Sequence, residues 1–553
     1  MKNLKLRRGI TILCALLILS SVFTGCGTKS APTDSENTAT TTAAPSDTAV
    51  PTENAAADNY EKLLKYTISG VSGDIAGLEK DGTVAYNYEW FTKKFNVELE
   101  FIPLTWQNYV DQQRLYMASG DGPDLMMMDI APKLYSEYLS WVKGGLLKEY
   151  QSLDNYPNMK KTMDSMVSGK KFIVDGKLYA WPAYMAGLDK YNYVGINAFY
   201  YRRDWAEKLG LAKPNDEYTW DEWINLVKTV LEKDPGGNGP DKTIGMMGKD
   251  YLFPKNFGAG SISPYLLDYT KGADGKWVWG PQLPESLEAV KFVKKLYDDG
   301  LIWKDQPMVK ASDTTEKGEA GLLFASAVDS LSPSSWKRNV DKYAAAHPEE
   351  DAQAVKAVAL VKGPDGKYLT RQKSDQWSQQ AMNANLSDEK VTRWMHMIDF
   401  MVSEDGINFI RYGIPDKDWV TEDGKVVVKW TKDVNGAVVK PYTYGSVWWQ
   451  RAFITADGIE LQDPGFAGYF QENVNRMYNA YNSPDGRVIN LNPDLAYFTG
   501  ENFSKTGTKE NEIFQQIAGL MVSKDVEKDW NDWVASKMPE IQPVLDELNA
   551  QLK

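Results

Sequence analysis

The placement of cysteine constrains this chain more than any other feature of its sequence. The two cysteines, Cys14 and Cys26, lie near the N-terminus, and none follows. No disulfide can therefore staple the body, and with His347 and His396 as the only histidines a Cys/His zinc site is excluded. Buried apolar surface must hold the body together, and 43% hydrophobic residues supply it. Because 553 residues exceed what one core holds, we expect two or more lobes.

The first 25 residues have the pattern of a signal peptide. A basic start precedes an apolar run at 10–19, half the roughly 20 residues that span a bilayer. Thr24 and Gly25 before Cys26 resemble a bacterial lipobox, although Phe23 stands where that motif usually has Leu. The resemblance implies that the thiol of Cys26 takes a diacylglycerol and that the preceding peptide bond is cut. An ordinary signal peptide with a fortuitous cysteine is the alternative.

Residues 26–59 have the composition of a disordered tether. They are rich in Thr, Ala, Ser and Pro, contain no aromatic residue, and hold Val50 as the one large aliphatic side chain. Such a segment cannot bury enough apolar surface to offset its ordering entropy. We therefore expect a globular body at 60–553, anchored through lipid at the extracellular face of a bacterial cell membrane.

The net negative charge of the chain disfavours some classes of binding partner. It carries 62 basic and 75 acidic residues, a net charge of −13, and removal of the first 25 residues makes this more negative. An acidic surface repels phosphate backbones, so nucleic acid is not an expected partner. The same surface disfavours adsorption to anionic lipid, so membrane attachment depends on the anchor at Cys26.

The start of the body alternates between strand and helix patterns. Strands are predicted at 65–69, 97–104 and 124–129, with helices between them at 84–95 and 106–118. This order gives a parallel α/β sheet, whose ligand crevice lies at the carboxyl ends of its strands. Later helices are predicted at 220–232, 285–299, 387–403 and from 525 to the C-terminus.

The segment LYMASGDGPD at 115–124 contains a Gly-x-x-Pro-Asp turn. It resembles the signature of the family 1 extracellular solute-binding proteins of ABC importers. Further segments resemble the same family in its order: 175–182, 200–205, 208–211, 219–222, 293–302, 317–321 and 409–413. Pro415 and Asp416 depart from the Glu-Gly pair that the family usually has at that point.

The resemblance implies an α/β, two-lobed, periplasmic-binding-protein type II fold with hinge-linked lobes and an extended C-terminal helical region. Its lobes are expected at about 60–198 with 325–378, and at 199–324 with 379–553. The resemblance also implies a monomer that needs no cofactor, captures an oligosaccharide between the lobes, and delivers it to the transmembrane subunits of an ABC permease.

A sugar site needs flat aromatic platforms and polar side chains in the plane of the ring. Position in the sequence selects these ligand-binding candidates: Trp181, Tyr184, Tyr193, Trp336, Trp377, and Trp448 and Trp449 with Arg451. Carboxylate candidates from the first lobe are Glu89 beside Trp90, Asp124 and Asp129. For Asp124, a turn-making role is the stronger interpretation.

The loop at 234–243 resembles a calcium loop that some members of the family carry. Asp234, Asn238 and Gly239 match that pattern, but Gly236 and the early Asp241 leave two side-chain oxygens missing or out of register. We expect a plain Gly/Pro loop, with a structural calcium ion on Asp234, Asn238 and Asp241 as the alternative.

Two other classes of function stay open at this point. A cell-surface polysaccharide-degrading enzyme needs paired carboxylates or a Tyr/His/Arg constellation. A peptide or lipid-precursor binder needs a charged clamp, for which Arg202 and Arg451 are candidates. Neither histidine has a nucleophile context, since His396 follows a helical pattern and His347 lies in a Lys/Ala/Glu-rich run where exposure is expected. We expect no enzymatic activity.

Overall fold

A computed structural model describes residues 58–552 apart from a set of internal segments. These segments are 72–78, 81–82, 85, 106–107, 185–192, 196–197, 240, 249–254, 328–339, 341, 351–356, 373–374, 433–449, 451, 455–467 and 490–492. The expected signal peptide, the lipidation site Cys26 and most of the tether therefore lie outside the described residues. Among the residues that are described, no helix is long and apolar enough to cross a membrane.

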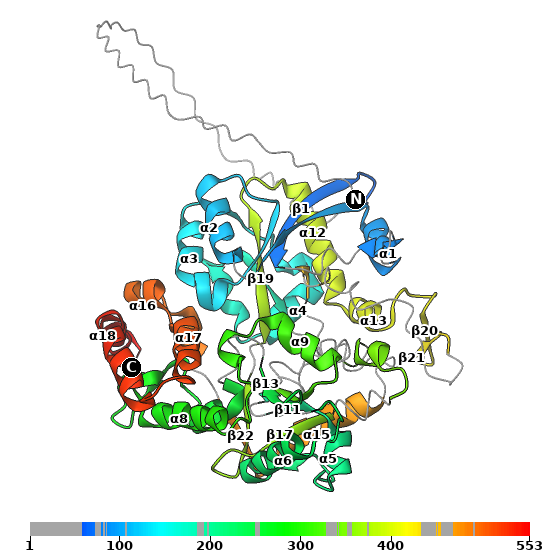
Figure 1. Cartoon of the computed structure of the whole chain (residues 1–553). Coiled ribbons are helices and arrows are strands. Elements are labelled where there is room, and N and C mark those ends of the chain that lie inside the picture. The colour runs from blue at the N-terminus through cyan, green and yellow to red at the C-terminus, as the bar shows by residue number, and fades with distance from the viewer. Residues whose placement is uncertain are drawn as a thin grey trace, which may run out of the picture. The chain divides into compact units, whose positions relative to one another are not determined.

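The first sheet has six strands (Figure 1). Its order is β4 (Val97–Leu104), β1 (Leu64–Val71), β5 (Leu125–Met128), β19 (Gln376–Asn383) and β6 (Leu147–Lys148), with β9 (Ala180–Tyr184) also paired to β19. Strand β1 runs parallel to β4 and β5, and β19 runs antiparallel to β5. Helices α1 (Tyr86–Phe95) and α2 (Tyr109–Ser119) connect the parallel strands, as the alternating pattern predicts.

Apolar periodicity explains the core of the first sheet. In β1 the alternate residues Leu64, Tyr66 and Ile68 are buried, and all four residues of β5 are buried. The faces are covered by α3 (Tyr135–Lys143), α4 (Pro157–Ser165), α12 (Asp388–Met401) and α13 (Glu404–Tyr412). Helix α12 begins where the Ser387 hydroxyl accepts a hydrogen bond from the Lys390 N–H, a standard N-cap.

The second sheet has five strands. Its order is β12 (Glu217–Tyr218), β17 (Ala357–Val361), β11 (Ala198–Tyr201), β16 (Leu323–Ala327) and β13 (Ile244–Met247). Strand β11 is antiparallel to both neighbours, whereas β13 is parallel to β16. The accompanying helices are α5 (Arg203–Lys208), α6 (Trp220–Lys233), α8 (Pro284–Asp298) and α9 (Ala311–Glu319). Thr219 and Glu222 form a capping box at the start of α6.

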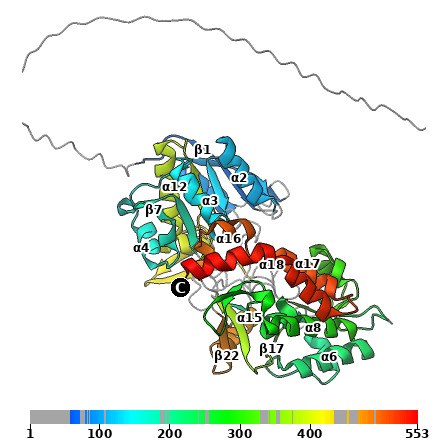
Figure 2. The same cartoon turned by 90° about the vertical axis from the view of Figure 1, so that its left-hand side faces the viewer.

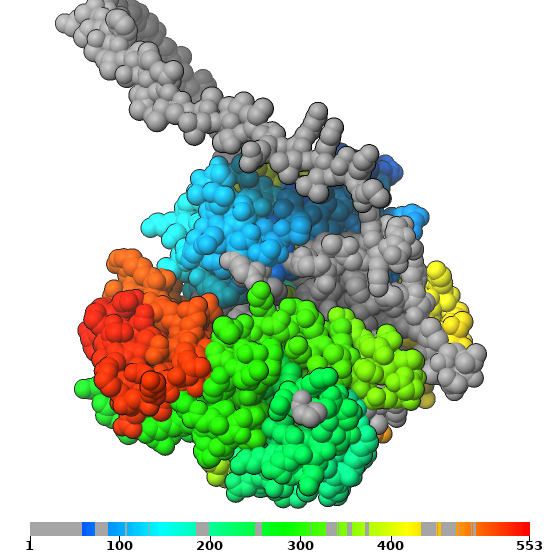
Figure 3. All heavy atoms as spheres, in the orientation of Figure 1, coloured from blue at the N-terminus to red at the C-terminus, as the bar shows by residue number. Residues whose placement is uncertain are grey.

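The C-terminal helices pack on the second core. These are α16 (Glu501–Thr506), α17 (Glu510–Leu520) and α18 (Val526–Gln551). Trp279 and Trp533 pack with ring centroids 5.5 Å apart, and α18 contacts α8 (Figures 1 and 2). In the space-filling view the red C-terminal helices cover the flank of the green segment (Figure 3). The extended C-terminal helical region is thus present.

The assignment of segments to the two lobes differs from the expected boundaries. Strands β16 and β17 belong to the second sheet, although 325–378 was expected in the first lobe. Strand β19 and helices α12 and α13 complete the first core, although the helices and the strand from residue 379 on were expected in the second lobe. The reason is packing, because β17 is buried along its whole length between β11 and β12, and Trp394 of α12 is fully buried in the first core.

A third, small sheet joins the segments that pass between the two cores. It consists of β10 (Tyr193–Gly195), β18 (Tyr368–Gln372) and β22 (Gly486–Ile489). Strand β10 precedes the second core, β18 precedes the return to the first core, and β22 precedes the final segment on the second core. Both cores belong to one compact unit, Ala55–Lys553. The three crossings and the two α/β cores give the expected two-lobed fold.

Candidate functional site

The carboxyl edge of the first sheet brings together a charged and aromatic cluster. Asp129 directly follows β5, and its carboxylate accepts a hydrogen bond from the Tyr109 hydroxyl at 2.7 Å. Lys133 Nζ lies 3.3 Å from Asp129 and 5.0 Å from the centre of the Tyr109 ring. The side chains of Asp129 and Lys133 are 26% and 51% exposed. Because parallel strands end here, this edge is where an α/β sheet presents ligand-binding groups.

A bulge in β19 places Trp377 at the same edge. The pairing of β19 with β9 shifts register between Gln376 and Gln379, and Ser378 has a φ of 67°. Such a bulge re-aims the side chains of its strand. Gln379 Oε1 accepts the Ile130 N–H at 2.6 Å, which ties the bulge to the residues after β5. Trp377 is half-buried and, among the predicted aromatic platforms whose side chains the structure describes, fits the candidate site best.

Two tyrosines extend this edge. The rings of Tyr135 and Tyr497 meet edge-on with centroids 5.1 Å apart, and Lys171 Nζ lies 5.3 Å from the Tyr497 ring centre. Burial raises the pKa of the Tyr497 hydroxyl, while hydrogen bonds with Ser168 and Gln376 oppose that rise. Burial also raises the pKa of the Tyr135 hydroxyl, which donates to the Lys171 carbonyl at 2.8 Å. Both hydroxyls are therefore neutral at pH 7.

Tyr109, Lys133, Tyr135 and Tyr497 were not selected from the sequence. A usable signal exists for Lys133 and Tyr135, because both closely follow the buried run of β5. No local signal marks Tyr497, since it reaches this edge from a late 3₁₀ turn (Pro493–Tyr497) far along the chain.

Trp181 is not an exposed platform, and its selection as a ligand-binding residue was wrong. Its side chain is 0% exposed in the first core, and its indole N–H donates to the Phe453 carbonyl at 2.9 Å. The Trp181 ring is therefore enclosed by the lobe and cannot stack on a solute. Trp90 packs against Phe409 with centroids 5.0 Å apart, at the partly buried margin of that core. Trp90 is partly buried, and its role in binding stays a prediction.

The remaining predicted residues fall into two groups. Glu89 is exposed in the first turn of α1 and holds Lys93 Nζ at 2.5 Å. Its role in binding stays a prediction. Tyr184 lies in β9 and Tyr193 lies in β10. For these two tyrosines the structure describes the strand but not the side chain. Outside the described residues lie Trp336, Trp448, Trp449 and Arg451.

Asp124 links three elements of the first lobe. Its carboxylate accepts hydrogen bonds from the Thr67 N–H at 3.0 Å and from Lys390 Nζ at 2.9 Å. Its own N–H donates to the Thr67 hydroxyl at 2.9 Å. These bonds fasten the turn before β5 to β1 and to α12, which is a structural role; a role of Asp124 in binding stays a prediction.

A family model described as bacterial extracellular solute-binding protein matches residues 76–406. The chain belongs to this family. Over 281 residues it is 30% identical to the lipoprotein LipO of Bacillus subtilis, covering 48% of this chain and 51% of LipO. Over 488 residues it is 22% identical to the polygalacturonan/rhamnogalacturonan-binding protein YtcQ of Bacillus subtilis, covering 83% and 87% of the two chains.

Solved structures share the fold of this solute-binding protein. An alginate-binding protein without calcium ion aligns with a TM-score of 0.61 at 18% identity, covering 89% of this chain and 98% of that one. The substrate-binding protein FusA of Streptococcus pneumoniae, in complex with kestose, aligns with a TM-score of 0.59 at 17% identity, covering 88% and 100%. At these identities the likeness concerns the two-lobed fold.

The loop at 234–243 in this solute-binding protein is closed by its own hydrogen bonds. The Asp234 carboxylate accepts from the Thr243 hydroxyl at 2.6 Å and from the Gly239 and Asn238 N–H groups at 2.8 and 3.2 Å. The Asn238 side chain turns its NH₂ toward Thr243 at 3.0 Å. Asp241 is exposed with a φ of 61°. Loop donors thus occupy the carboxylate that a calcium loop would direct at the ion.

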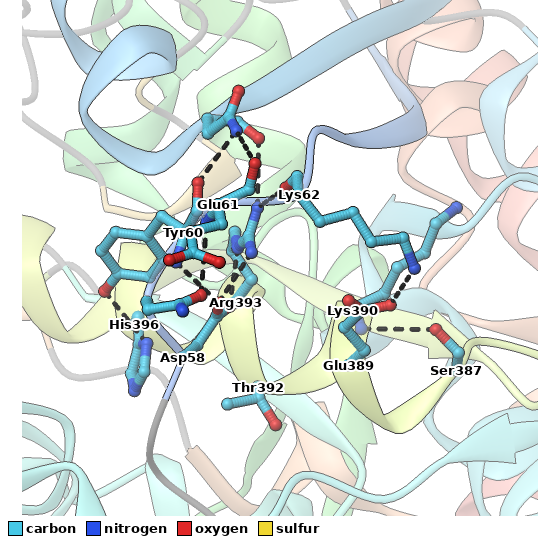
Figure 4. Close-up of polar contacts among 12 residues, drawn as sticks. Asp58, Tyr60, Glu61, Lys62, Ser387, Glu389, Lys390, Thr392, Arg393 and His396 are labelled. Atoms are coloured by element: carbon cyan, nitrogen blue, oxygen red, sulfur yellow. Dashed lines mark hydrogen bonds and ion pairs between the residues drawn. The ribbon is translucent and has the colours of Figure 1, made fainter.

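A buried ion pair fixes the start of the body to α12 (Figure 4). Arg393 is 1% exposed, and its guanidinium donates to both carboxylate oxygens of Asp58 at 2.6 and 2.7 Å and to the Lys62 carbonyl. The Tyr60 hydroxyl lies 3.0 Å from His396 Nδ1. The body therefore makes specific contacts from Asp58 onward, two residues before its expected start.

A cavity of about 740 Å³ lies at the opposite edge of the first sheet, between β6 and the start of α12. Charged side chains of Lys148, Glu149, Asp388 and Glu389 share its wall with apolar residues. It is separate from the cluster around Asp129, because β6 pairs with the far end of β19.

Proposed function

We propose that this protein captures an extracellular oligosaccharide and delivers it to an ABC importer. The observation that carries the proposal is the placement of Trp377 at the same sheet edge as Asp129, Tyr109 and Lys133. An indole face stacks on the C–H face of a sugar ring, and a carboxylate, hydroxyls and an ammonium satisfy the hydroxyls around it. Trp377 is the proposed platform and Asp129 the proposed hydrogen-bond acceptor.

The relatives support the class of ligand. YtcQ is named for binding polygalacturonan and rhamnogalacturonan, and FusA for transporting fructooligosaccharide. The match to FusA is 30% identical over 221 residues, which is 37% of this chain and 40% of FusA. These two relatives are named for different glycans, so the names support the ligand class and not one particular glycan. We therefore propose for this chain an oligosaccharide held between two lobes that close around it.

The proposal includes lipid anchoring through Cys26. A tether between a lipid and a two-lobed body keeps the body near its permease while leaving it free to rotate. The name of the relative LipO, a lipoprotein, supports this arrangement. The acidic composition favours a covalent anchor over electrostatic adsorption to anionic lipid.

Titration calorimetry tests the binding site directly. The wild-type chain is titrated with a panel of short fructooligosaccharides and oligogalacturonides, alongside Trp377→Ala and Trp533→Ala. We expect saturable binding of at least one glycan class, with about tenfold or greater loss of affinity in Trp377→Ala. Trp533, half-buried in α18, is the matched control and should leave affinity unchanged.

Two results would overturn the proposal. Release of new reducing ends from any bound glycan would identify an enzyme. Equal affinity of the wild type and Trp377→Ala would remove Trp377 and this sheet edge from the site.

A further inference from the structure

A cluster of metal-ligating side chains lies in the second lobe, away from the candidate ligand site. It contains His347, Glu349 and Glu350, whose ligand atoms all lie within 4.8 Å of one another. Arg202, which follows β11, and Gly321, which precedes β16, border it. Since β11 is antiparallel to β16, both border residues lie at the edge opposite to the carboxyl ends of β13 and β16.

The imidazole of His347 is held in one orientation. Its ring stacks on Tyr343 with centroids 4.4 Å apart and planes at 24°. Its Nε2 lies 3.0 Å from the Glu319 carbonyl oxygen. A carbonyl oxygen only accepts, so Nε2 carries the proton and donates it. In the neutral ring, the lone pair therefore belongs to Nδ1, as in histidines that bind metals through one nitrogen and a backbone carbonyl through the other.

Two carboxylates lie near Nδ1. Glu350 Oε1 lies 3.9 Å and Glu349 Oε1 lies 4.0 Å from Nδ1, both beyond hydrogen-bond distance. An ion with tetrahedral bonds of about 2.0–2.1 Å separates its ligand atoms by roughly 3.4 Å. Each carboxylate oxygen therefore has to move about half an ångström closer to Nδ1. The two oxygens, within 4.8 Å of each other, also have to approach one another, and Glu349 is exposed enough to move.

Glu350 is positioned by bonds to its other oxygen. Its Oε2 accepts from the Tyr343 hydroxyl at 2.9 Å and from Arg202 Nη2 at 3.2 Å, while Oε1 faces His347. Arg202 is itself fixed, because it donates to both oxygens of Asp204 and lies 4.6 Å from the centre of the Trp205 ring. Outer-shell hydrogen bonds of this kind orient the ligands of metal sites.

We propose that His347, Glu349 and Glu350 bind one divalent transition-metal ion of the zinc class, with water completing its coordination. One imidazole nitrogen and two carboxylates suit zinc and its neighbours in the first transition row. Calcium prefers six to eight oxygen ligands, which these three side chains do not supply. The bound ion links His347 to Glu349 and Glu350 and so stabilises this turn of the second lobe.

Cobalt is the most informative probe of this site. Protein purified without a histidine tag is stripped with chelator and titrated with Co²⁺, and the visible absorption of the ion reports tetrahedral coordination. Zn²⁺ is then added to displace the cobalt, and Ca²⁺ is added in a parallel sample. We expect one Co²⁺ per chain, displacement by Zn²⁺ and no displacement by Ca²⁺.

Three variants decide which residues bind. His347→Gln and Glu349→Gln should each lower Co²⁺ affinity by about tenfold or more. His396→Gln removes the chain's other histidine and should leave affinity unchanged. Glu349 is exposed, so its variant tests the site even if His347→Gln disturbs folding, which circular dichroism of the metal-free proteins checks. Absence of Co²⁺ binding at micromolar concentration, or equal affinity in Glu349→Gln, would overturn the proposal.

Discussion

Asp58 and Arg393 are 335 residues apart in sequence, yet their side chains form a two-pronged ion pair at 2.6 and 2.7 Å. The Arg393 side chain is 1% exposed and that of Asp58 is 12% exposed. The pair fastens the first residues of the body to α12, which packs on the first sheet. It therefore closes the first lobe where the expected tether ends.

Replacing Asp58 by Asn should destabilise the body. The change leaves a buried guanidinium without its counter-charge, and breaking such a pair from one side costs about 3 kcal/mol. Chemical denaturation measures the free energy of unfolding. The matched control is Glu389→Gln, which breaks the Lys62–Glu389 pair, whose side chains are 67% and 44% exposed. This control should cost under about 1 kcal/mol, and an equal cost in both variants would contradict the assignment.

The same pair predicts a pH dependence. Burial alone would raise the pKa of Asp58, but hydrogen bonds from Arg393 and from the Tyr60 N–H outweigh it and hold the pKa below its ordinary value. A carboxylate with a lowered pKa stabilises the fold above its unfolded pKa of about 4, and this contribution is lost as pH falls through the folded value. The stability difference between wild type and Asp58→Asn should shrink below pH 4. A constant difference down to pH 3 would contradict this.

The first sheet could be predicted from sequence because its information is local. Alternating apolar residues in β1 and β4, and a continuous apolar run in β5, each indicate a strand without reference to the rest of the chain. Assignment of β17 and β19 to a lobe could not be predicted in the same way. Both strands are almost wholly buried, so their patterns do not identify the sheet that covers them. Only their pairing partners do so.

The candidate site shows the same limit at the level of single residues. Trp377 and Trp181 are both tryptophans in or beside strands, but one is half-buried at a bulge and the other is fully buried. His347 was expected to be exposed, and its side chain is 24% exposed because Tyr343 and the Glu319 carbonyl hold it. The exposure of each of these side chains depends on packing against distant parts of the chain. The residue type and its neighbours in the sequence do not determine that packing.

Trp181→Phe should separate stability from binding. Phe leaves part of the cavity empty and deprives the Phe453 carbonyl of its donor, so the free energy of unfolding should fall by about 2–3 kcal/mol. Glycan affinity of the folded fraction should stay at the wild-type value. Chemical denaturation measures the free energy of unfolding, and titration calorimetry below the unfolding temperature measures the affinity. A selective loss of affinity with unchanged stability would return Trp181 to the binding site.

Thr243→Val should weaken the loop at 234–243 in the absence of calcium. The change keeps the shape of the side chain but removes the hydroxyl that donates to Asp234 and accepts from Asn238. We expect a loss of about 1 kcal/mol in unfolding experiments with a calcium chelator present. Thr229→Val in α6, whose exposed hydroxyl donates to the Asn225 carbonyl at 2.8 Å, is the control and should change stability by under about 0.5 kcal/mol. Equal stability of Thr243→Val and wild type would show that the hydrogen bonds do not hold the loop.

Cys26→Ser should release the protein from the membrane. Serine has no thiol to accept a diacylglycerol, and the apolar run at 10–19 is about half the length needed to span a bilayer. Cell fractionation with immunoblotting measures the partition between membrane and medium, and incorporation of labelled palmitate measures acylation. Cys14→Ser is the matched control, because Cys14 lies inside the segment expected to be removed, and it should keep both retention and label. Unchanged membrane retention of Cys26→Ser would mean that another part of the chain holds the body at the surface.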